Sequence, residues 1–86
     1  MIWTKSDIRY ARKIMLVPIL IKKGYSLRKL ENDNFLIENK FGKLIVKNNY
    51  WFRADSKESG NAIDFFIYIE KLTFSDAMKI LMPKNC

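Results

Sequence analysis

The first apolar pattern along the chain has the spacing of an amphipathic helix. Ile8, Ala11 and Met15 recur at intervals of three and four residues, which places them on one stripe of a helix over residues 7–16. Ser6 is a favourable N-cap residue for this helix. Four basic side chains line the opposite face of the predicted helix: Lys5, Arg9, Arg12 and Lys13.

A proline separates this helix from a second one. Pro18 lacks a backbone N–H and its ring clashes with a preceding helical turn, so we expect the first helix to end before it and a short second helix to begin there. The second helix is expected to end at Lys22 or Lys23, because Gly24 suits the left-handed residue that commonly follows a helix.

Residues 25–53 show the shorter period of β-strands. Loosely alternating and β-branched or aromatic runs are separated by clusters of turn-forming residues. Asn32–Asn34 form one predicted turn, and Asn48–Asn49 predict a tight hairpin. The segment therefore predicts an antiparallel meander of three to four short strands, over residues 25–30, 35–38, 44–47 and 50–53.

Two helices are predicted after the strands. Asn61 is placed to cap a largely apolar helix over residues 62–71, and Thr73 to cap a last helix that ends before Pro83. The predicted fold is therefore α+β, a small antiparallel meander flanked by N-terminal and C-terminal helices.

The composition limits the size of the fold and the chemistry it can support. The chain has 86 residues, enough for a single domain over residues 1–86, and 14% of them are aromatic, a heavy share for so small a core. It has no histidine and one cysteine, Cys86. A disulfide within the chain, a Cys/His zinc site and a histidine base are therefore excluded, and we expect neither a metal nor a cofactor.

The positive charge is concentrated at one end of the chain. Residues 1–30 hold eight basic side chains and one acid, which accounts for the whole net charge of +7, whereas residues 31–86 hold eight of each sign. Such a concentration of positive charge is typical of proteins that bind a polyanion, above all a nucleic acid. A solvated, solubilising surface is the alternative, and a membrane surface a lesser one.

The apolar runs predict no membrane-spanning segment. The longest, residues 14–21, is interrupted by Pro18 and is too short to cross a bilayer. It also lacks the flanks of a signal peptide. We therefore expect a cytoplasmic protein with no membrane partner.

A motif in the last third of the chain resembles a known domain. Gly60–Phe66 reads Gly-Asn-Ala-Ile-Asp-Phe-Phe, and Leu72–Ala77 reads Leu-Thr-Phe-Ser-Asp-Ala. Both segments, at this spacing, are similar to the end of the zinc-binding domain of bacterial DnaG-type primases. Upstream segments fit in the same order, including Lys22–Leu27 after the opening helix, so the resemblance covers roughly residues 7–82.

The chain departs from that domain at the metal ligands. Counting back from Gly60, the two positions of the primase Cys-x-x-Cys fall on Arg53 and Ser56. The closer resemblance is to zinc-free relatives found beside Toprim-type or helicase domains in replication and mobilisation proteins of plasmids and conjugative elements. Those relatives carry a hairpin rich in Trp, Arg and Ser, which resembles Trp51–Ser56 here. The folding free energy that a metal supplies would then come from apolar packing.

The resemblance implies binding without catalysis. In the primases, this domain engages the single-stranded template and works beside a separate polymerising core. For this chain, the resemblance implies a non-catalytic accessory subunit that binds single-stranded DNA. It would dock to a larger polymerase, primase or helicase in the replication of a mobile element such as a plasmid, phage or cassette.

The strands supply the leading candidate site for nucleic acid. Single strands are usually held by a positive groove and by aromatic faces on which bases stack. The arrangement we predict turns four apolar or aromatic residues inward: Leu44, Val46, Tyr50 and Phe52. The predicted outward set is Lys43, Lys47, Trp51 and Arg53. The alternative places Trp51 in the core, in which case Tyr50 takes its place in the site.

Further basic groups join the candidate site. Arg9, Arg12 and Lys13 on the first helix are expected to contact phosphates, which positions a strand without reading its sequence. Lys57 lies in the loop that replaces the ligand turn, where adaptable contacts are expected. The alternative for each of these groups is that it belongs to an ordinary solvated surface. A weaker set of candidates is Lys22, Lys23, Arg28 and Lys29.

Two other classes of function are weighed against DNA binding. The positive charge equally suits a protein–protein adaptor or phage-type inhibitor that binds an acidic partner without nucleic acid. An independent enzyme has little support. Asp64 is explained by its place in the first turn of a helix, Glu70 and Asp76 are expected on the surface, and Asp55 beside Ser56 has no base to complete a nucleophilic set.

Overall fold

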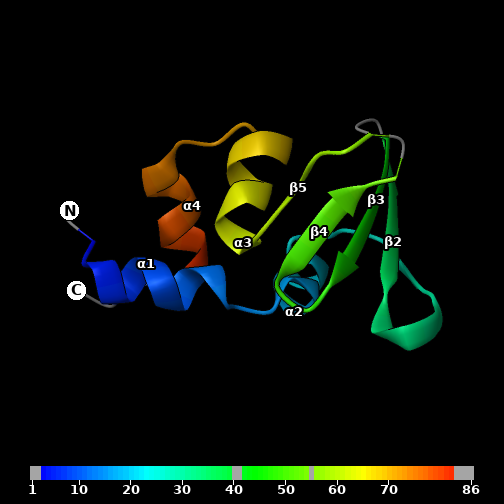
Figure 1. The fold of residues 1–86 in the computed structure, drawn as a ribbon, viewed down its shortest axis with the longest axis horizontal. Coiled ribbons are helices and arrows are strands. Elements are labelled where there is room, and N and C mark those ends of the chain that lie inside the picture. The colour runs from blue at the N-terminus through cyan, green and yellow to red at the C-terminus, as the bar shows by residue number, and fades with distance from the viewer. Residues whose placement is uncertain (1–2, 40–41, 55, 83–86) are drawn as a thin grey trace.

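The computed structural model describes residues 3–39, 42–54 and 56–82 of the chain. Within these ranges the fold is α+β, as predicted, with an antiparallel sheet and helices that lie to one side of it (Figure 1). Asp55, Pro83 and Cys86 lie outside the described residues.

The sheet is a meander in which each strand pairs with the next one along the chain. Its five strands are β1 (Leu27–Lys29), β2 (Phe35–Asn39), β3 (Gly42–Lys47), β4 (Tyr50–Arg53) and β5 (Ser59–Gly60). Four of them match predicted strands. The fifth, β5, has only two residues and is too short to carry a recognisable hydrophobic period.

Asparagine residues make the two predicted turns of the sheet. Asn32 and Asn48 have φ angles of 59° and 56°, in the left-handed region that asparagine tolerates better than most residues. The hairpin at Asn48–Asn49 pairs Lys47 with Tyr50 and Val46 with Trp51. This register decides which side chains of β3 and β4 share a face of the sheet.

Helix α1 (Lys5–Arg12) begins two residues earlier than predicted. Its N-cap is Thr4, and the predicted N-cap Ser6 lies inside the helix. The reason is a reciprocal capping box, in which the Asp7 N–H donates to Thr4 Oγ1 at 3.0 Å and the Thr4 N–H donates to Asp7 Oδ2 at 3.1 Å.

The break between α1 and α2 (Leu16–Lys22) also comes earlier than predicted. The β3–β4 turn supplies hydrogen bonds at this break: Asn49 Nδ2 donates to the Arg12 carbonyl at 2.5 Å, and the Leu16 N–H donates to the Asn48 carbonyl at 2.9 Å. Pro18 therefore falls in the first turn of α2, where its missing N–H removes no helical hydrogen bond.

The helix predicted over residues 62–71 is shorter and less regular than expected. It consists of α3 (Ala62–Asp64) followed by a π-helical turn (Phe65–Ile69). The predicted cap is confirmed, because Asn61 and Asp64 exchange hydrogen bonds of 3.1 Å between side chain and backbone in both directions. Wider turns of this kind usually occur singly inside helices. Here the turn carries Phe65, Phe66 and Ile69, all buried.

The predicted start of the last helix and the predicted end of α2 are also confirmed. Thr73 caps α4 (Phe74–Leu81), and its Oγ1 accepts a hydrogen bond of 3.1 Å from the Asp76 N–H. Gly24 follows α2 with a φ angle of 92°, where a residue without a Cβ avoids strain.

Aromatic rings form the centre of the core. Phe65 makes edge-to-face contacts with Tyr25, Trp51 and Phe66, at ring-centroid distances of 6.0, 6.2 and 5.3 Å. Pairs of this kind each contribute about 0.5–1.5 kcal/mol beyond the burial of their area. These four aromatic rings therefore join the sheet and the chain before it to the π-helical turn.

Glu70, predicted to lie on the surface, belongs to a half-buried polar cluster. Tyr25 Oη donates a hydrogen bond of 2.6 Å to Glu70 Oε2, and Lys23 Nζ lies 3.5 Å from Glu70 Oε1. The Glu70 side chain is only 14% exposed, because the π-helical turn brings it back over β1 and the end of α2. Burial, together with the hydrogen bond to the Glu70 carboxylate, raises the pKa of Tyr25 well above its ordinary value of 10.0.

This pKa gives a first prediction. The unfolded state releases the Tyr25 proton at a lower pH than the folded state. The stability that the protonated Tyr25 contributes to the fold is therefore complete below pH 10.0 and is lost as the pH rises through the folded pKa. We therefore expect the free energy of unfolding to fall more steeply above pH 10.0 in the wild type than in a Tyr25→Phe variant. Urea denaturation at stepped pH measures both slopes, and equal slopes would contradict the prediction.

Candidate nucleic-acid interface

The sheet has one buried face and one open face. The inner face, toward the helices, carries side chains that are at most 1% exposed: Ile37, Leu44, Val46 and Trp51. The opposite surface, which we call the outer face, carries two half-buried apolar residues, Leu36 and Ile45, and seven exposed residues, Arg28, Glu38, Lys43, Lys47, Tyr50, Phe52 and Ser59. No helix in the described ranges covers the outer face.

Trp51 does not lie on the outer face, so its predicted place in the site is wrong. The indole is 1% exposed, its Nε1 donates to the Asn61 carbonyl at 3.0 Å, and its ring packs edge-on against Phe65. The physical reason is the register of the hairpin, because Trp51 lies directly opposite the buried Val46 and opposite residues share a face. Trp51 is therefore a core residue, which is the alternative considered from the sequence.

Tyr50 and Phe52 occupy the outward positions of β4, although both were predicted to face inward. Tyr50 is 49% exposed and Phe52 is 41% exposed. Phe52 belongs to a row of cross-strand partners that runs over all five strands: Arg28, Leu36, Ile45, Phe52 and Ser59. The inward positions of Leu44 and Val46 are confirmed.

Lys43 and Lys47 lie on the outer face, as predicted. Lys43 Nζ is 3.6 Å from Glu38 Oε2, but both side chains are about 60% exposed, so water screens this pair and it is weak. Lys47 is the last residue of β3 and lies opposite Tyr50. One cation thus lies directly beside an exposed ring.

Arg53 is not on the outer face, and its predicted outward position is wrong. It lies opposite the buried Leu44, and its side chain is 21% exposed. Its Nε binds Glu58 Oε1 at 2.6 Å, so a neighbouring carboxylate already engages its charge. The sequence offered no signal for this ion pair, because it depends on the β4–β5 connection folding back on β4.

The end of α1 lies next to the strand ends that carry Lys47 and Tyr50. The contact is the hydrogen bond from Asn49 Nδ2 to the Arg12 carbonyl. Arg9, Arg12 and Lys13 are all exposed, and Arg9 precedes Arg12 by about one helical turn. The structure therefore places the end of α1, which carries the predicted cations Arg12 and Lys13, next to the Asn48–Asn49 turn.

Lys57 lies in the connection between β4 and β5, away from the outer face. It is exposed and borders a small hollow whose other lining residues are Trp51, Glu58, Ser59 and Tyr68. Tyr68 is 55% exposed beside it, which the apolar pattern of its helix did not predict.

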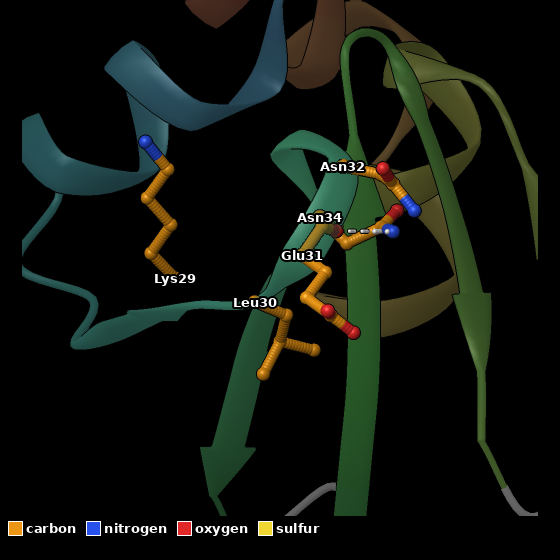
Figure 2. Close-up of a pocket in the computed structure, with 5 residues that line it drawn as sticks. All are labelled: Lys29, Leu30, Glu31, Asn32 and Asn34. Atoms are coloured by element: carbon orange, nitrogen blue, oxygen red, sulfur yellow. Dashed lines mark hydrogen bonds between the residues drawn. The ribbon is translucent and has the colours of Figure 1, made fainter.

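A second hollow lies at the connection between β1 and β2, and Figure 2 shows its side chains. Asn34 Nδ2 donates to the Glu31 carbonyl at 2.9 Å, which holds the turn. Lys29 and Glu31 point away from one another in Figure 2. The side chains here maintain a turn and do not converge on a common point.

The described residues contain no group of three or more His, Cys, Asp or Glu side chains placed to hold a metal ion. In the same residues, none of the helices has the length and apolar character needed to cross a membrane. Comparison of the sequence with protein-family models and with curated proteins found no match. The function of this chain is therefore inferred from its surfaces and from its own sequence motifs.

Proposed function

We propose that this protein is a non-catalytic accessory subunit of DNA replication that binds single-stranded DNA on the outer face of its sheet. It also docks to a larger polymerase, primase or helicase, in the cytoplasmic replication of mobile-element DNA. The replication setting follows from the resemblance of Gly60–Ala77 to the end of the DnaG-type primase zinc-binding domain and its zinc-free relatives.

The observation that carries the proposal is a pair of exposed aromatic rings on an open sheet face. Tyr50 and Phe52 are two residues apart on the same side of β4, so their backbone positions are about 6.6 Å apart. Unpaired bases stack on exposed aromatic rings irrespective of sequence, whereas a duplex hides its base faces. This arrangement therefore favours a single strand over a duplex.

Basic side chains around the rings supply the phosphate contacts that a single strand needs. Arg28, Lys43 and Lys47 lie on the outer face, and Glu38 is the one acid among its exposed residues in the described ranges. Arg12 and Lys13 extend the positive surface beyond the hairpin turn. Contacts of this kind bind the backbone of any sequence and are strongly sensitive to salt.

Fluorescence anisotropy with labelled oligo-dT tests the proposal. If three phosphates are neutralised, the slope of log K against log salt is about −2 for a single strand, so binding should weaken roughly 30-fold between about 50 and 300 mM salt. Folded protein that does not bind at low salt, or that binds equally well at both concentrations, would contradict it. A partner retained without any oligonucleotide affinity would favour the protein–protein adaptor instead.

Charge removal in the interface should lower both affinity and salt dependence. We expect a Lys47→Gln and Arg12→Gln double variant to bind oligo-dT more weakly, with a salt slope that is smaller by about 0.7 for each phosphate that the variant no longer neutralises. Lys79→Gln is the matched control, because Lys79 is equally exposed but lies on α4. A parallel loss of affinity in the control would mean that only net charge matters.

A further inference from the structure

An apolar groove lies on the helical side of the molecule. Its volume is about 610 Å³, and residues from α1, α2 and α4 and the chain next to these helices line it: Tyr10, Ile14, Ile19, Lys22, Lys23, Ile80, Leu81 and Met82. α2 packs against β3, and its Leu16 and Leu20 are fully buried. The groove uses the other flank of α2, so it and the outer face belong to different layers.

The lining of this groove is apolar and partly accessible. Tyr10 is 64% exposed, whereas Ile14, Ile19 and Ile80 are half-buried. Monomeric proteins seldom leave apolar residues gathered in this way unless a partner covers them.

The charges at the groove are positive. Lys22 is exposed and makes no ion pair among the described residues, whereas Lys23 is held by Glu70 at 3.5 Å. Lys22 and Lys23 are the two charged residues among its lining, and none of the lining residues is acidic. An occupant of this groove therefore meets a cationic rim, formed by these two lysines, beside an apolar floor.

We infer that this groove binds an acidic amphipathic helix of a partner protein. A helix fills such a groove with apolar anchors at positions i, i+3, i+4 and i+7, and carboxylates on its flanks match the cationic rim. A second copy of this chain fits less well, because it brings the same positive charge. The inference rests on the docking part of the proposed function and is independent of single-strand binding.

A designed peptide tests the inference directly. The probe is a labelled helical peptide of about 20 residues with a leucine stripe at the anchor positions and glutamates on the remaining face. One control replaces the glutamates with lysines, and a second keeps the composition but breaks the stripe. We expect the acidic stripe peptide to bind the full chain at least about tenfold more tightly than either control.

Variants on exposed side chains assign the binding to the groove. Tyr10→Ala and Lys22→Glu should each weaken peptide binding by about five- to tenfold, and far-UV circular dichroism checks that both variants are folded. Tyr50→Ala and Lys47→Glu are the matched controls on the outer face, and they should leave peptide binding unchanged.

The outcomes separate this inference from single-strand binding. If the stripe peptide fails to bind, or the lysine peptide binds equally well, the inference is overturned, while retained oligo-dT binding leaves the DNA-binding half of the proposal standing. Self-association of the chain that Tyr10→Ala abolishes also overturns it, because a second copy then fills the groove. If the protein still binds the stripe peptide but does not bind oligo-dT, only the DNA-binding half of the proposed function is overturned.

Discussion

Replacing Trp51 with alanine is expected to remove most of the free energy of unfolding of this protein. Removing a buried indole from a packed core typically costs about 3–5 kcal/mol. A domain of this size starts near the low end of the roughly 5–15 kcal/mol that folded proteins possess. Trp51 also supplies the edge-on contact to Phe65 and the hydrogen bond to the Asn61 carbonyl, so its loss disconnects the sheet from the helix that follows it.

Thermal unfolding followed by far-UV circular dichroism measures this effect. Tyr50→Ala is the matched control on the same strand, because an exposed ring should change stability by no more than about 0.5 kcal/mol. Trp51→Phe should fall between the two, since it keeps an aromatic ring against Phe65 but loses the N–H donor and part of the buried ring volume. A stable, folded Trp51→Ala protein that no longer binds oligo-dT would instead place the indole on the binding surface.

Local chemistry was enough to predict most of the fold. The asparagine turns, the caps at Asn61 and Thr73, and Gly24 after α2 each depend on interactions within a few residues, and all are present. The start of α1 was missed although its capping box between Thr4 and Asp7 is equally local, whereas the break after α1 depends on contacts with a distant segment. The early break between the first two helices uses groups of the hairpin turn at Asn48–Asn49, some 30 residues further along the chain, which helical periodicity cannot reveal.

The position of Trp51 could have been predicted from the sequence. A two-residue turn at Asn48–Asn49 pairs Lys47 with Tyr50 and therefore Val46 with Trp51. Since Val46 belongs to the buried run of β3, the same turn puts Trp51 inside and Tyr50 outside. The predicted set combined the outer face of β3, with Lys43 and Lys47, with the inner face of β4, which this register does not allow.

The rest of the candidate site could be predicted only in part. Lys43 and Lys47 followed from the alternation of β3, and the exposed α1 cations followed from its amphipathic pattern. The outward position of Arg53 was wrong for the same reason as that of Trp51, because the register puts it opposite the buried Leu44. Its ion pair with Glu58 has no sequence signal, because it depends on a connection of irregular structure. Charge patterns thus located the basic surface, whereas ion pairs decided which cations remain available.

The double variant Tyr50→Ala and Phe52→Ala is expected to lose roughly 100-fold in affinity for oligo-dT while keeping its stability. Each base that stacks on an aromatic ring contributes about 1–3 kcal/mol, and two platforms lie on this strand face. Because both rings are exposed, their removal leaves no cavity in the core. Most of the loss should persist at high salt, since stacking, unlike phosphate contact, releases no counterions.

The matched control for this experiment is Tyr10→Ala with Phe74→Ala. Phe74 is 41% exposed, as is Phe52, and Tyr10 is 64% exposed, but both residues lie on helices away from the outer face. Anisotropy titrations at low and high salt, with urea unfolding of each variant, separate stacking from stability. If the control variant loses as much affinity as the outer-face variant, exposed rings contribute only non-specific contact. If neither loses any, oligo-dT is held by the basic residues alone, and the outer face carries no stacking site.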